Sequence, residues 1–205
     1  MADDQPDGQS DRLGPTEGSL RWHLQQVRDS LVGALDGLDE YDRRRPMTPS
    51  GTNLLGLVKH LAGIELEYLG LCVGRPPAVE LPWVADQAIW ESADMWATAD
   101  ESSEELIELY RGAWRHADES IEQLGLSAPA TVPWWPEERR DTTLGVLLVR
   151  VVSETSQHAG HADILREMID GRGGGDHDDV GDEQWWLDHV ARVQHAADAH
   201  RPATS

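Results

Sequence analysis

One stretch near the C-terminal end limits the fold more than any other part of the chain: residues 142–171, TTLGVLLVRVVSETSQHAGHADILREMIDG. It contains no proline and runs from a pair of threonines to Gly171, which are start and stop signals for one helix. At about 3.6 residues per turn, one face of this helix carries leucine and valine at both ends and Glu154, His158 and His161 in its middle. Ionisable side chains are almost never buried unless they are paired or bound to a metal. The sequence therefore predicts either a charge pair or a metal site inside a helical core.

Charge and composition exclude several classes of protein. The chain has 205 residues and a formal net charge of -21, which should repel nucleic acid and anionic membrane surfaces. The single cysteine, Cys72, excludes an internal disulfide and a thiolate zinc cluster. The acidic N-terminus does not resemble a secretory signal, and no apolar run reaches the ~18 residues of a membrane span. We expect a cytoplasmic protein that binds neither nucleic acid nor membrane.

Apolar residues at helical spacing predict three more long helices, over residues 19–38, 52–74 and 102–125. We expect Ser19 and Thr52 to cap the first two, and Ser102 with Glu105 to form a capping box on the third. Residues 76–99 are irregular and read as a long crossover that carries a short helix, and residues 183–201 predict a short final helix. The fold class is all-α: a four-helix bundle with a long crossover connection and a short C-terminal helix.

This pattern also predicts the domain limits. We expect a disordered acidic tail over residues 1–17, the helical bundle domain over 18–190, and a helix end with a frayed tail over 191–205.

A second histidine, His60, lies at the edge of the apolar stripe of the helix predicted over 52–74. Glu154 and His158 can reach one metal ion from consecutive turns, His161 lies one turn further on, and His60 would complete a set suited to Zn²⁺ or Fe²⁺. Three protein ligands leave one coordination position open, as in catalytic metal sites. Two simpler interpretations stay open: Glu154 pairs with a histidine, or the helix turns these residues towards solvent.

Two segments, TNLLGLVKHLAGIELEYLG and ETSQHAGHADILREMIDG, resemble the DinB (YfiT-like) superfamily of metal-binding four-helix bundles, in particular an actinobacterial branch. The resemblance extends from about residue 20 to residue 186. It implies that His60, Glu154 and His158 are the metal ligands, with Glu154 at a position where most members have histidine. The Glu-x3-His arrangement is similar to that of mycothiol-dependent maleylpyruvate isomerase. His161 is then a proton carrier and the candidate catalytic residue. Alternatively, His161 is a fourth metal ligand or takes the place of Glu154 as a ligand.

The function implied by the resemblance is that of a metal-dependent transferase or isomerase that joins a small thiol, mycothiol, to a small electrophile. Zinc is the expected metal, with Fe²⁺ or Ni²⁺ as alternatives, and a homodimer is an expected assembly. Two other functions stay open: a metal-stabilised bundle without catalysis that serves as a binding or stress module, and an Fe²⁺ centre with oxygen-dependent chemistry like that of ergothioneine synthases.

Three other features have weaker functional interpretations. Trp134 and Trp135 could cover a pocket, although a tryptophan pair beside prolines more often only packs. Cys72 is expected to be a small buried apolar residue. The acidic residues between 176 and 183 lack the ligand spacing of a calcium loop, so we expect a solvated loop there.

Overall fold

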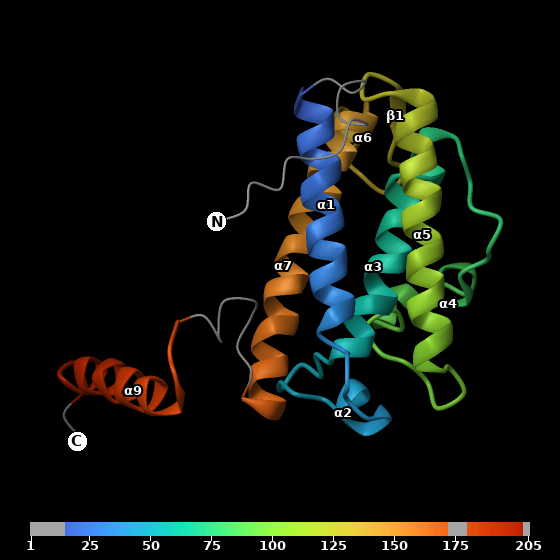
Figure 1. Ribbon diagram of the computed structural model, residues 1–205. Helices are drawn as coiled ribbons and strands as arrows, with labels where there is room; N and C mark the ends of the chain where they lie inside the picture. Colours follow the sequence, from blue (N-terminus) through green and yellow to red (C-terminus); the bar gives the residue numbers. More distant parts are fainter. Residues whose placement is uncertain (1–14, 172–179, 203–205) are drawn as a thin grey trace.

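Four long helices lie side by side in the computed structural model, which describes residues 15–171 and 180–202 (Figure 1). They are α1 (Pro15–Gly33), α3 (Leu54–Tyr68), α5 (Ser103–Leu124) and α7 (Leu144–Asp170). The closest packing is between α3 and α5 and between α1 and α7, and α3 also packs on α7. This architecture confirms the predicted all-α bundle.

The connections explain how α3 and α7 become neighbours. The short helix α2 (Glu40–Arg44) turns the chain from α1 into α3. A long crossover over residues 69–102 then returns along the bundle, so α3 and α5 run in the same direction (Figure 1). The crossover was predicted, and it carries η2 (Leu71–Val73), α4 (Pro82–Ala85) and η3 (Ala88–Glu91).

A small hairpin closes the end of the bundle between α5 and α7. Strand β1 (Pro129–Thr131) pairs antiparallel with β2 (Asp141–Thr143), and α6 (Glu137–Arg140) lies between them. Ala130 and Val132 are buried there against the bundle. The sequence predicted only a loop, because strands of three residues around several prolines show no measurable alternation.

Local signals placed both ends of α5 and α7 within two residues, whereas the helices predicted over 19–38 and 52–74 end earlier, at Gly33 and Tyr68. The predicted capping box of Ser102 and Glu105 is present, and α5 ends at Gly125. Gly171 ends α7 with a left-handed φ of 76°, a conformation that glycine adopts without steric cost. The N-cap of α3 is Asn53 instead of Thr52, since the Asn53 side chain accepts from the backbone N–H of Gly56.

The predicted start of the first helix was late. α1 begins at Pro15 instead of after Ser19, because proline at the start of a helix loses no hydrogen bond. The last three residues of the predicted tail therefore belong to α1, and the rest of that tail lies outside the described residues.

The core contains a buried ion pair that the sequence analysis missed. Arg28 of α1 donates to both carboxylate oxygens of Glu65 of α3, and also to Asp118 of α5. Arg28 and Glu65 are fully buried. Burial alone would lower the pKa of Arg28, but Glu65 and Asp118 raise it above its ordinary value. Arg28, Glu65 and Asp118 thus connect three helices. The sequence held the same kind of signal here as at Glu154, a charged residue on an apolar helix face, because Arg28 follows the buried Leu24 by one turn.

The predicted C-terminal helix is α9 (Glu183–Asp198), which has no buried residue and stands apart from the four long helices in Figure 1. Within the two described ranges, no helix is both long and apolar enough to cross a membrane.

Candidate metal centre

The packing of α3 on α7 brings together the three predicted ligands. His60 lies in the middle of α3, and Glu154 and His158 lie one turn apart in the middle of α7. Each is partly buried, with side-chain exposures of 16%, 25% and 14%. One ligand atom from each residue lies within 4.8 Å of the others. The simpler possibility that the α7 stripe faces solvent is therefore not what the structure shows.

The distances within this group match a shared metal better than hydrogen bonding. Glu154 Oε1 lies 3.7 Å from His60 Nε2 and 3.5 Å from His158 Nε2. Both distances exceed the usual range of about 2.7–3.2 Å for an N–H···O hydrogen bond. Ligands placed about 2.0–2.2 Å from a tetrahedral zinc ion lie about 3.3–3.6 Å from one another. The two distances from Glu154 Oε1 are thus close to those expected between ligands of one metal ion.

Each imidazole has a second polar side chain beside its other ring nitrogen, close for His60 and more distant for His158. His60 Nδ1 lies 2.6 Å from Asp94 Oδ2, and His158 Nδ1 lies 3.4 Å from His161 Nδ1. If each Nδ1 carries the proton, each Nε2 presents its lone pair towards Glu154 Oε1. Metal-binding histidines are usually fixed in this way, by donating the other ring N–H to a neighbouring acceptor. The chemistry and orientation of the donors therefore fit a divalent metal.

Asp94 is the residue of this site that the sequence analysis missed. It belongs to the crossover between η3 and α5, and only 6% of it is exposed. Its partner His60 is 34 positions away, so no local spacing connects them. Glu91 is a second acid three positions earlier and is exposed, so nothing in the sequence of the crossover set Asp94 apart.

The crossover is fixed to α3 on the C-terminal side of Asp94. Asn53 Nδ2 donates to the carbonyl of Met95, and that carbonyl packs so closely on Gly56 that an added Cβ would lie 1.8 Å from its oxygen. Glycine is therefore required at position 56 for the crossover to approach. This approach places Asp94 beside His60.

Lys59, the only lysine in the chain, makes a second attachment. It is buried and donates to the carbonyl of Trp96 and to Glu101 Oε2, while its ammonium lies 4.6 Å from the ring centroid of Trp83. Lys59 thus holds the crossover through the Trp96 carbonyl and Glu101, and its neighbour His60 holds it through Asp94.

His161 lies outside the group of three. It is exposed, contacts His158, and is not among the side chains whose ligand atoms lie within 4.8 Å of one another in the described residues. Burial lowers the pKa of His158, and the nearby His60 lowers it further, despite the opposing effect of Glu154. A neutral His158 is the form that can bind a metal. His161 thus lies between His158 and solvent.

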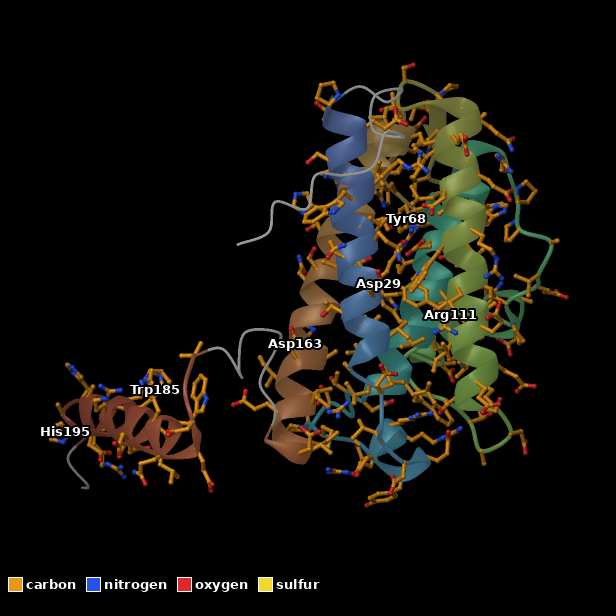
Figure 2. All side chains as sticks on the ribbon, viewed as in Figure 1. Asp29, Tyr68, Arg111, Asp163, Trp185 and His195 are labelled. Carbon is orange, nitrogen blue, oxygen red and sulfur yellow. The ribbon has the colours of Figure 1, made fainter. Side chains whose placement is uncertain are left out.

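The predicted tryptophan pair packs on Tyr68, the last residue of α3. Trp134 Nε1 donates to the hydroxyl of Tyr68 at 3.2 Å, and Trp135 also contacts the Tyr68 ring. Arg150 of α7 lies over both rings, 4.9 Å from the centroid of Tyr68 and 5.7 Å from that of Trp135. Figure 2 shows Tyr68 between the long helices of the bundle. The tryptophans between β1 and β2 thus form an aromatic cluster with Tyr68, and Arg150 connects this cluster to Glu154.

The remaining sequence interpretations concern residues away from this centre. Cys72 is buried as expected, and burial together with nearby Glu67 raises its pKa to about 12, so it stays a thiol at neutral pH. Residues 176–179 of the acidic segment lie outside the described residues, while Asp182 is the N-cap of α9 and Glu183 its first residue.

A family model described as mycothiol-S-transferase matches residues 19–171 of the chain. A comparison with curated proteins finds no match. Among solved structures, the chain is similar to a crystal structure described as a conserved protein from Enterococcus faecalis, with a TM-score of 0.56 and 15% sequence identity. That likeness covers 75% of this chain and 96% of the other, and it supports the fold alone.

Proposed function

The chain belongs to the mycothiol-S-transferase family, a DinB-like family of helical proteins, and we propose that it is a metal-dependent enzyme that transfers a low-molecular-weight thiol to a small electrophile. The observation that carries the proposal is the convergence of His60 Nε2 and His158 Nε2 on Glu154 Oε1, with a second polar side chain beside each Nδ1. A charge pair alone would not need two imidazoles fixed in this way.

His60, Glu154 and His158 would hold the metal, and zinc suits a set of two imidazoles and one carboxylate. When bound, a divalent metal supplies the means to keep a thiol deprotonated at neutral pH. Because three protein ligands leave one coordination position for an exogenous group, the donor set suits catalysis better than a closed structural site. No thiolate comes from the protein itself, since the sole cysteine is buried with a raised pKa.

The other residues have supporting roles in this proposal. Asp94 accepts from His60 Nδ1 and fixes that ring, and His161 lies beside His158 with 3.4 Å between the two Nδ1 atoms. The exposed His161 can exchange a proton with solvent, so we assign to it the passage of the released proton from the centre to solvent.

Consumption of thiol tests the proposed reaction. Zinc-loaded protein should accelerate the loss of mycothiol in the presence of a small alkylating electrophile, and the His158→Ala variant should not. His161→Ala should keep its zinc and react more slowly, by about 10²–10⁴-fold if it acts in general acid–base catalysis. A zinc-loaded wild-type protein that leaves every thiol and electrophile pair at the uncatalysed rate would support the alternative of a metal-stabilised bundle without catalysis.

Metal identity needs a separate experiment. Elemental analysis of protein purified without a metal-affinity tag should find zinc. Iron in its place would favour the oxygen-dependent alternative, and nickel would show that the donor set selects a different ion.

A further inference from the structure

We propose that Arg150, mounted on the rings of Tyr68 and Trp135, binds a carboxylate of the electrophile beside the candidate metal centre. This inference rests on the proposed function, because only that function makes the bound carboxylate part of a reactant. The binding site itself follows from the contacts of Arg150.

The position of Arg150 is fixed by its surroundings. It precedes Glu154 by one turn of α7, and its guanidinium carbon lies 4.9 Å and 5.7 Å from the ring centroids of Tyr68 and Trp135. Tyr68 is buried and receives a hydrogen bond from Trp134 Nε1, so the ring beneath the guanidinium is itself held in place. Cation–π contact with two rings orients the planar guanidinium without using its N–H donors.

Those donors have no acceptor among the described residues. The nearest carboxylate oxygen, Glu154 Oε2, lies 3.9 Å from Arg150 Nη2, which is too far for a hydrogen bond. The Arg150 side chain is 41% exposed, so a small molecule can reach it. A guanidinium binds a carboxylate through two parallel hydrogen bonds, which is the interaction that this geometry leaves open.

The other cations of α3 and α7 are already engaged. Lys59 donates to Glu101 and to the carbonyl of Trp96. Arg166 donates to Asp170 and to the carbonyls of Ala34 and Asp36. Arg150 is therefore the lysine or arginine of these two helices whose donors are available to a ligand.

Glu154 connects Arg150 to the metal centre. Its Oε1 faces His60 and His158, while its Oε2 faces Arg150. A carboxylate bound by Arg150 would lie beside Glu154, next to the metal centre, and we propose that the adjacent carbon is the one that meets the thiol. The net charge of -21 repels an anionic reactant, and the positive charge of Arg150 opposes that repulsion locally.

The substrate class is therefore a small acid whose reactive carbon is next to its carboxylate. With iodoacetate, the thiolate sulfur attacks the methylene carbon, an S–C bond forms, the C–I bond breaks, and iodide leaves with the electron pair. The proton released by the thiol passes to solvent. No oxidant or reductant is needed.

Binding of benzoate and of its neutral analogue benzamide tests the site without any reaction. We expect zinc-loaded wild-type protein to bind benzoate more tightly than benzamide in a calorimetric titration. Arg150→Met should weaken benzoate binding by about tenfold to hundredfold, the usual effect of losing a charge-assisted hydrogen-bonded pair, and Arg150→Lys should weaken it less. Arg111→Met is the matched control, because Arg111 is exposed on α5 (Figure 2).

Two results would overturn the proposal. Unchanged benzoate binding in Arg150→Met would place the carboxylate elsewhere. Loss of zinc from Arg150→Met, measured on the same samples, would show that Arg150 acts by holding Glu154 and not by binding a ligand.

The reaction gives an independent measurement. With mycothiol as the thiol, Arg150→Met should raise the KM for iodoacetate and leave the KM for iodoacetamide unchanged. Both reagents alkylate the thiol sulfur through a methylene carbon, and they differ in charge. Equal effects on both reagents would contradict a carboxylate site. If neither reagent reacts in wild-type protein, the proposed function fails, and the benzoate titration still decides whether Arg150 binds a carboxylate.

Discussion

Asp94 shows how a single crossover residue can control the chemistry of a helix-borne histidine. Its carboxylate lies 2.6 Å from His60 Nδ1, and this contact selects the tautomer in which Nε2 faces Glu154. Asp94→Asn should weaken zinc binding by about 10–100-fold, the usual effect of removing such a partner, while the melting temperature of the metal-free protein changes little. Competition with a chromogenic chelator measures the affinity. An unchanged zinc affinity in the variant would show that His60 does not depend on Asp94.

Gly56 gives a second test at the same scale, because it acts on Asp94 only through the backbone. A methyl group at position 56 would lie 1.8 Å from the Met95 carbonyl oxygen, so Gly56→Ala must push the crossover away and move Asp94 from His60. We expect weaker zinc binding and a lower melting temperature.

Gly63→Ala is the matched control for Gly56→Ala on the same helix. Its added methyl group would meet nothing closer than 3.6 Å, and alanine favours a helix interior over glycine by about 1 kcal/mol. This variant should keep its zinc affinity and be as stable as wild type or more stable. Equal zinc affinities in the two variants would contradict the role assigned to the crossover.

The crossover as an element is held by Lys59 and Glu101. Partial burial raises the pKa of Glu101, but hydrogen bonds from Lys59 and from the backbone of Thr98 outweigh it, and the pKa lies below its ordinary value. A carboxylate with a lowered pKa stabilises the fold above its unfolded pKa, and this contribution is lost as the pH falls through the folded pKa.

Glu101→Gln should therefore destabilise the protein at pH 7 and match wild type in strongly acidic solution. Urea unfolding from pH 7 down to pH 3 measures the difference. The exposed Glu122 provides the control, since Glu122→Gln should follow wild type throughout. A difference between Glu101→Gln and wild type that stays constant with pH would show that the ion pair is not its source.

The sequence predicted elements where the signal was local and missed those that depend on distant partners. Ser102 with Glu105 and Gly171 mark helix ends by their own chemistry, and the structure has the ends there. Glu154 and His158 were visible because they interrupt an apolar stripe. Asp94 was not, because only the path of the crossover brings it to His60, and the hairpin strands were too short to show a period.

At the scale of the whole molecule, α9 is distinct from the bundle. It has no buried residue, and its apolar side chains Leu187, Val190 and Val193 are each more than half exposed. The domain predicted over residues 18–190 includes the first half of this helix. The buried apolar residues of the two core clusters, however, come from α1 to α7 and from the segments between them. We infer that the four long helices with their crossover and hairpin form the stable unit.

Removal of residues 172–205 should accordingly leave the melting temperature and the zinc affinity unchanged. Differential scanning calorimetry and the chelator competition measure both properties on the shortened chain. A large fall in melting temperature would show that α9 packs on the bundle and contributes to its stability.

The central claim is that His60, Glu154 and His158 hold one divalent ion between α3 and α7. Equilibrium dialysis against zinc, followed by elemental analysis, tests it most directly. We expect one zinc per chain in wild-type protein and in His195→Ala, where an exposed histidine of α9 is removed (Figure 2). We expect Glu154→Ala to lose that stoichiometric zinc. Zinc retained at the wild-type level in Glu154→Ala would contradict the assignment.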